Sequence, residues 1–255
     1  MAPRPSLPNQ DPALDALSSP SRRQLAALWR SRAHNELVTS SVFASLHRDL
    51  MAFGADLGVL EISAQAVSDE VRHAVLCAEV AARYDGGTAS LNAVEPAEPP
   101  IFSVCSGRVA RALFAALHSA VNETLGTAYL GACLEEAKAT LIAKTALREI
   151  LSDEVRHARI GWAVLASNQL SSADRASIAN VMPVLLDVCV STWLADIERD
   201  YPDDLLQGHG CLRHEHLSSV IDDALHNVIV PGLDHVRIDS TPARAWLTAQ
   251  GRPSS

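Results

Sequence analysis

Aromatic residues are scarce in this chain. Phe, Trp and Tyr make up 4% of the 255 residues, whereas hydrophobic residues as a whole make up 48%. Ala and Leu dominate the apolar positions, which favours helix packing over sheet packing. No run of about 18 consecutive apolar residues occurs, so the sequence predicts no transmembrane helix. We therefore expect an all-α protein that does not insert into a membrane.

The chain also lacks an excess of basic residues. It contains 21 Lys and Arg against 30 Asp and Glu, which gives a formal net charge of −9 at pH 7. Binding to a phosphate backbone requires clustered Lys and Arg that displace counterions. The charge balance therefore predicts no nucleic-acid partner and no anionic membrane surface, and it favours a small-molecule substrate.

Cysteines are few and scattered, and no two of them form a C-x-x-C pair. The five are Cys77, Cys105, Cys133, Cys189 and Cys211. An odd number without such pairs predicts neither a disulfide framework nor a cysteine-ligated iron site. The first 20 residues contain five prolines and no apolar run of the kind found in signal peptides. These features predict a cytoplasmic protein.

Stretches that are free of Pro and Gly or rich in apolar periodicity predict four long helices. Their approximate ranges are 21–53, 57–84, 108–137 and 140–167. Between the second and the third helix, the Gly86-Gly87 pair and three prolines indicate a long crossover. Two helical hairpins joined in this way predict a ferritin-like four-helix bundle with one long connection.

The remaining segments complete the predicted domain organisation. Residues 1–20 are expected to form a disordered arm, and residues 21–168 the bundle. Residues 169–249 are expected to add helices that pack on the bundle and contribute to a homodimer contact. Residues 250–255 are expected to form a tail.

The hexapeptide DEVRHA occurs twice, at Asp69–Ala74 and at Asp153–Ala158. Within each copy, Glu and His are three residues apart, so on a helix they project from the same face. Small or apolar residues continue that face in both copies, which places the pairs toward the bundle interior. The pairs are Glu70 with His73 and Glu154 with His157.

Two further carboxylates, Glu36 and Glu123, lie in the apolar stripes of the first and third helices. A buried carboxylate is expensive unless it is paired or bound to a cation. An alternative interpretation treats both DEVRHA segments as ion-paired solvent faces, but it leaves Glu36 and Glu123 unexplained. Oxygen-rich ligation with one imidazole per metal suits iron or manganese better than zinc. The six residues thus predict a site for two iron ions, with a Mn/Fe pair as the other option.

With these residues, the chain resembles the ferritin-like di-iron carboxylate superfamily over about residues 21–168. Its paired D-E-x-R-H motifs are similar to those of bacterial multicomponent monooxygenases, acyl-carrier-protein desaturases and ribonucleotide reductase small subunits. The resemblance implies that each motif Asp accepts a hydrogen bond from the ligand His of the other motif, which orients the imidazole. It also implies that the two Arg neutralise the Asp pair. These supporting residues are Asp69, Arg72, Asp153 and Arg156.

The resemblance also implies a catalytic role for Thr127, four residues after Glu123. In multicomponent monooxygenases, a Thr at this place is thought to assist proton delivery, although a helical Thr also commonly bonds its own i−4 carbonyl. Gly126, Cys77 and Ile150 depart from the patterns of the peroxidase, radical-forming and N-oxygenating subfamilies. The subfamily is therefore left unassigned.

The predicted function is that of a non-haem di-iron oxygenase or oxidase that uses O₂ to hydroxylate, desaturate or N-oxygenate a small organic substrate. No flavin or iron–sulfur motif is present, so a separate reductase or ferredoxin is expected to supply electrons. The alternatives are a ferritin-like protein that oxidises and stores iron and a bundle that acts only as a binding partner. His209, Cys211, His214 and His216 lie close together and could ligate a transition metal, but their spacing matches no zinc pattern, so this segment is expected to be a flexible loop.

Overall fold

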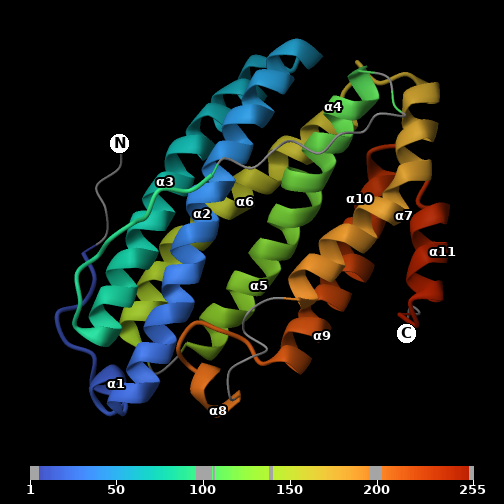
Figure 1. Cartoon of the computed structure of the whole chain (residues 1–255). Coiled ribbons are helices and arrows are strands. Elements are labelled where there is room, and N and C mark those ends of the chain that lie inside the picture. The colour runs from blue at the N-terminus through green and yellow to red at the C-terminus, as the bar shows by residue number, and fades with distance from the viewer. Residues whose placement is uncertain (1–5, 96–104, 106, 138–139, 196–202, 253–255) are drawn as a thin grey trace.

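The computed structural model describes residues 6–95, 105, 107–137, 140–195 and 203–252 (Figure 1). Helices account for all the regular secondary structure in these ranges, and none of the residues described there belongs to a strand. The expectation of an all-α protein is confirmed for this part of the chain.

Helices α2 (Ser19–Phe53) and α3 (Leu57–Asp85) form the first long pair and pack along each other. The Ser18 side chain caps the start of α2 by accepting a hydrogen bond from the backbone N–H of Ser21. Gly54 ends α2 with a φ of 84°, a conformation that favours glycine and turns the chain toward α3. Both helices begin and end within two residues of the predicted positions.

The second long pair contains a feature that the sequence did not predict. Helix α4 (Gly107–Ala115) continues through a π-helical turn, η1 (Ala116–Val121), into α5 (Asn122–Glu136). Helix α6 (Leu141–Ala166) packs against α5 and η1, and it also contacts α3. The two pairs thereby lie against each other (Figure 1). Polar side chains from α2, α3, α5 and α6 meet between them.

Two of the remaining helices join the others to the long pairs, since α7 packs against α4 and η1 and α9 packs against α5 (Figure 1). They are α7 (Ser172–Leu194), α8 (Asp203–Leu206), α9 (His214–Ala224), η3 (Leu225–Ile229), α10 (Val230–His235) and α11 (Thr241–Ala249). Arg175 on α7 is buried, and its guanidinium donates to the carbonyls of Leu165 and Val236 at 2.7 and 2.6 Å. This residue therefore ties the C-terminal helices to the end of α6.

Helix α7 is long and apolar enough to cross a membrane, judged by length and composition alone. Ile178, Met182 and Leu186 on this helix are nevertheless buried in the hydrophobic core. Core helices of other proteins pass the same test.

Part of the N-terminal segment departs from the predicted disordered arm. Residues 11–20 are ordered, with a short helix α1 (Pro12–Asp15) before α2 begins. The Asp11 carboxylate accepts from the backbone N–H of Ile142 at 2.9 Å, at the start of α6, and Leu14 is buried. The prediction was wrong for residues 11–20 because these contacts join segments about 130 positions apart, which local composition does not reveal.

The segment that begins at His209 is also anchored, contrary to the prediction of a flexible loop. The His209 ring nitrogen Nδ1 lies 2.9 Å from the Tyr84 hydroxyl and 3.2 Å from that of Thr140. The His209 carbonyl accepts from the Trp29 indole, and the His216 ring pairs with Glu136 at 2.7 Å. These buried and half-buried contacts hold the segment against the ends of α2, α3 and α5.

Candidate metal centre

The six predicted ligands converge from four helices into two overlapping groups. In each group, the donor atoms lie within 4.8 Å of one another. The first group is Glu36, Glu70, His73 and Glu154, and the second is Glu70, Glu123, Glu154 and His157. The carboxylates of Glu70 and Glu154 belong to both groups, so each of them could bridge two ions.

The two imidazoles point the same ring atom at the carboxylates. His73 Nδ1 lies 3.1 Å from Glu154 and 3.7 Å from Glu70. His157 Nδ1 lies 2.9 Å from Glu70 and 3.0 Å from Glu154. Both Nδ1 atoms are therefore placed to serve as metal ligands in their deprotonated form.

The opposite ring atoms face the carboxylates of the DEVRHA aspartates. His73 Nε2 lies 3.1 Å from Asp153, and His157 Nε2 lies 3.5 Å from Asp69. This is the crossed pairing that the resemblance implies. Burial alone would raise the pKa of Asp153, but its hydrogen bonds with His73 and Arg72 outweigh burial and hold that pKa below its usual value. An ionised carboxylate behind each ring fixes the orientation of the imidazole.

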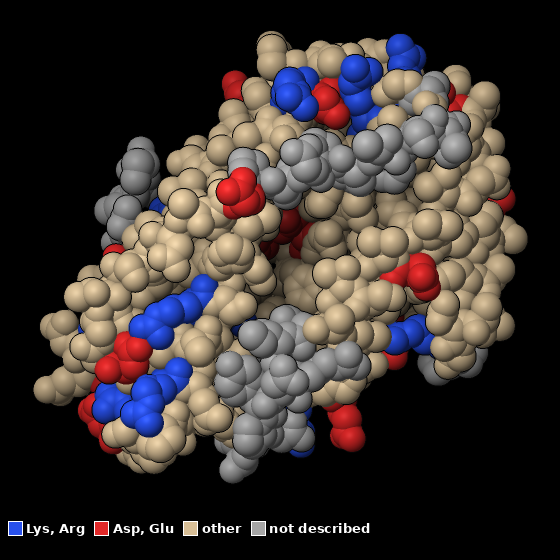
Figure 2. Space-filling model, in the orientation of Figure 1, with Lys and Arg blue, Asp and Glu red and all other residues tan. Residues whose placement is uncertain are grey.

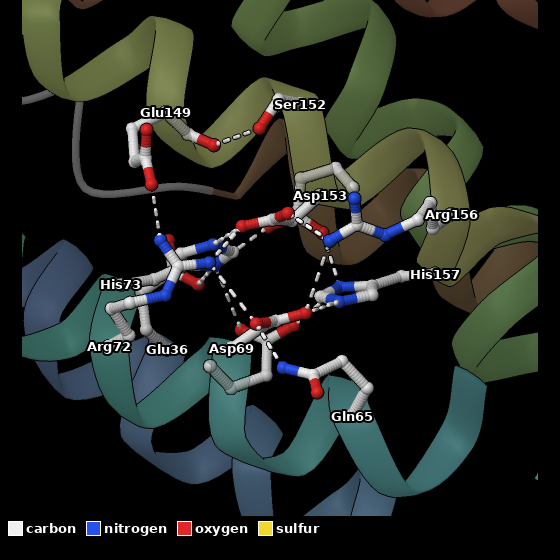
Figure 3. A network of polar contacts seen from close by, with 12 residues as sticks. Glu36, Gln65, Asp69, Arg72, His73, Glu149, Ser152, Asp153, Arg156 and His157 are labelled. Atoms are coloured by element: carbon white, nitrogen blue, oxygen red, sulfur yellow. Dashed lines mark hydrogen bonds and ion pairs between the residues drawn. The ribbon is translucent and has the colours of Figure 1, made fainter. Parts of the chain in front are cut away.

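Two arginines bridge the aspartates on the outer side of the cluster (Figure 3). Arg72 donates to Asp153, to Asp69 at 3.1 Å and to Glu149 at 2.6 Å. Arg156 donates to Asp153 and lies 3.5 Å from Asp69. The Arg72 side chain is 10% exposed and that of Arg156 is 46% exposed. The two motifs thus share one ion-paired network, which is closed to solvent at Arg72 and open at Arg156.

Alignment of the two motifs reveals supporting residues that the sequence reasoning missed. The identity extends one residue further toward the N-terminus, to Ser68 and Ser152, and the positions four before each Asp are Gln65 and Glu149. Gln65 donates to Asp69 at 2.8 Å, whereas Glu149 accepts from an arginine. A search for equivalent residues around the repeat would have found this pair.

The protonation of the cluster follows from its burial. Burial raises the pKa of Glu36 to about 8, and burial together with the charge of Glu154 raises that of Glu123 well above its usual value. Burial opposes the charged imidazoles, but hydrogen bonds with the surrounding carboxylates raise the pKa of His157 to about 12 and that of His73 well above normal. At neutral pH, the metal-free cluster therefore holds protons on Glu36 and on both imidazoles.

The residues fit a pair of divalent metal ions. Among the described residues, neither carboxylate oxygen of Glu70 has a partner with full hydrogen-bond geometry, although His157 Nδ1 lies 2.9 Å away, and the Glu70 side chain is 1% exposed. A carboxylate in such a place is costly unless a cation compensates it. Four carboxylates balance the charge of two divalent ions, and the set of oxygen donors with one imidazole for each group suits iron or manganese.

A close contact between η1 and α6 fixes the backbone beside His157. The buried Ser119 hydroxyl donates to the His157 carbonyl at 2.5 Å and accepts from the Gly161 N–H at 2.7 Å. In a regular α-helix, that N–H and that carbonyl are partners of each other, so the hydroxyl bridges them. A Cβ on Gly161 would lie 2.2 Å from the Ala120 nitrogen and 2.5 Å from the Ala115 carbonyl oxygen. Glycine is therefore required for the contact.

Thr127 does not line the cavity that leads from the surface to the cluster. Its hydroxyl is buried and makes no hydrogen bond within the described part of the chain, so the alternative bond to the i−4 carbonyl is not formed either. The role of Thr127 in proton delivery therefore stays a prediction.

A cavity of about 350 Å³ extends from the surface to the cluster. Figure 2 shows a hollow in this face of the molecule, with acidic side chains visible at its base. Four ligands border the cavity, namely Glu36, Glu70, Glu123 and Glu154. Its other walls include apolar and aromatic side chains, among them Leu28, Trp29, Val42, Tyr129, Leu130 and Trp193. A small organic molecule that enters from the surface could therefore reach the donor atoms along these apolar walls.

Within the described part of the chain, no other group of His, Cys, Asp and Glu has metal-binding geometry. His209 and Cys211 are accordingly not metal ligands of a second centre in this arrangement. No family model, curated protein or solved structure matches the chain.

Proposed function

We propose that the chain is a ferritin-like di-metal carboxylate protein that uses O₂ to oxidise a small organic substrate. The metal ligands are Glu36, Glu70, His73, Glu123, Glu154 and His157, and the metal is a pair of iron ions or a Mn/Fe pair. The observation that carries the proposal is the cavity that reaches four of these ligands.

The walls of that cavity favour an oxidoreductase over an iron-storage protein. A storage site needs only a path for metal ions and O₂, and a polar channel would serve it. The cavity here has aromatic and aliphatic side chains beside polar ones such as Asn35, Thr39 and Asn122, and its volume lies within the range of small-molecule sites. Hydroxylation, desaturation and N-oxygenation all remain within the proposal.

The proposal assigns a task to the metal ions, to the buried acidic residues around them and to the apolar walls of the cavity. Two bound iron ions would supply the redox chemistry that reduces O₂. Glu70 and Glu154 would span the ion pair, and Asp69 and Asp153 hold the two imidazoles in place. The apolar walls exclude water from the substrate.

The electrons must come from outside the chain. Hydroxylation of R–H with O₂ gives R–OH and water and consumes two electrons and two protons. A separate reductase or ferredoxin would deliver the electrons, because the sequence contains no flavin or iron–sulfur motif.

The test is metal analysis of the purified full chain, followed by O₂ uptake after anaerobic reduction. We expect two metal ions per chain and O₂ consumption that stops when the metal is removed. Glu70→Ala should lose the metal, whereas Glu61→Ala, which changes an exposed Glu of the same helix, should retain it. Zinc, no metal, or equal metal content in both variants would refute the proposal, and many iron ions per chain would favour storage.

A further inference from the structure

His118 is a cavity residue that the proposed metal chemistry does not use. It lies on the π turn, its ring meets that of Phe114 edge to face at 5.0 Å, and it borders the cavity together with Glu123. Its ring nitrogens make no hydrogen bond within the described part of the chain. Burial lowers the pKa of His118 to about 4, so the ring is neutral at physiological pH. A neutral imidazole offers one donor and one acceptor.

The π turn explains why His118 reaches the cavity. The Asn122 N–H donates to the Leu117 carbonyl, five residues earlier, and this pattern brings residues five apart onto one face. His118 and Glu123 are such a pair. In a regular α-helix they would point about 140° apart. The turn thus places a neutral hydrogen-bonding group one helical turn from a metal ligand.

Arg32 also lines the cavity, but its charged group already has partners in the protein. The Arg32 guanidinium donates to the Tyr129 hydroxyl at 2.8 Å and to the Gly210 carbonyl at 3.1 Å. It also stacks on the Trp29 ring, 4.6 Å from the centroid. Arg32 therefore braces the wall. The Trp193 indole is likewise committed, since it donates to the Asn122 side chain at 3.3 Å.

We propose that His118 is the substrate-binding residue of the cavity and that the substrate is an uncharged molecule with a flat apolar body and one hydrogen-bonding group. The apolar body packs against Trp29, Tyr129 and Trp193, and the polar group pairs with the His118 ring. This arrangement holds the neighbouring atoms of the molecule toward Glu123. The role as a substrate rests on the proposed function, whereas the binding itself does not.

The binding experiment uses the full chain, with and without metal, and four probes of similar size. Phenol and indole are neutral, benzoate is anionic and benzylammonium is cationic. Dissociation constants are measured by calorimetry, and ligand-observed NMR confirms contact with the protein. We expect the neutral probes to bind at least tenfold more tightly than either ion. Benzoate or benzylammonium binding as tightly as phenol would overturn the proposal.

Variants assign the binding to His118. His118→Leu should weaken phenol binding at least fivefold, His118→Gln should recover part of it, and His235→Leu, at an exposed position, should change nothing. Circular dichroism and metal content check that each variant is folded, and the Gln variant keeps the test decisive if the Leu variant does not fold. Equal phenol affinity in the wild type and His118→Gln and His118→Leu variants would overturn the assignment.

The outcomes separate the two proposals. A chain that binds no metal but binds phenol through His118 refutes the metal proposal alone. A chain that holds two metal ions but binds no neutral probe refutes the His118 proposal alone.

Discussion

Metal binding should displace protons, and the number can be worked out from the structure. In the metal-free cluster, burial keeps a proton on Glu36, and hydrogen bonds with carboxylates keep His73 and His157 protonated, which makes three. Metal ions bind only the deprotonated donors. Two divalent ions should therefore release at least about three protons at pH 7. Because each displaced proton changes the equilibrium tenfold per pH unit, the overall constant for both ions should rise by at least about 10³ from pH 6 to pH 7.

Calorimetry can count these protons directly. Mn²⁺, which is stable in air, is titrated into the metal-free chain in three buffers of different ionisation enthalpy, and the slope of the observed heat against that enthalpy gives the protons released. Glu36→Gln should release about one proton fewer than the wild type, and Glu61→Gln should match the wild type. A release of one proton or none, or no difference for Glu36→Gln, would show that the cluster is not protonated as described.

Two further predictions concern stability. The pKa of Glu36 is raised to about 8 in the folded chain, so its stabilising contribution is complete below about pH 4.5 and is lost as the pH rises to 8; this residue alone should cost the metal-free protein about 1 kcal/mol per pH unit in that window. In urea unfolding, stability should therefore fall less steeply with pH in Glu36→Gln than in the wild type, by about 1 kcal/mol per pH unit, and equal pH slopes would contradict this. Gly161→Ala should destabilise the chain by about 3 kcal/mol because its Cβ meets the backbone of η1, whereas Gly131→Ala, where a Cβ would meet nothing within 4 Å, should be neutral or stabilising by about 1 kcal/mol. Equal unfolding midpoints for the two alanine variants would show that the contact around Gly161 is not tight.

Much of the helical layout could be predicted because it has local causes. The ranges of α2 and α3 follow from apolar periodicity and from the glycines that end them. The convergence of Glu36 and Glu123 with the repeated motif could also be predicted, because each lies on an apolar stripe where a lone carboxylate is costly.

Other features depend on contacts that no local pattern carries. The π turn shifts the helix face by one residue. A regular α-helical periodicity, which the sequence pattern predicts, would instead place His118 away from the cavity. Ser119 gains its role only because α6 approaches η1 at Gly161. Asp11 and His209 are held by partners more than 100 positions away.

The unequal neighbours of the two aspartates have a spectroscopic consequence. Arg72 donates to both aspartates and to Glu149, but the Gln65 amide donates to Asp69, whereas Arg156 donates to Asp153. Each ion would bind one His and three Glu. The groups behind the histidine ligand would nevertheless differ between the ion beside His157 and the ion beside His73. In ⁵⁷Fe-enriched protein we expect two quadrupole doublets rather than one, and the two positions should fill at different metal concentrations.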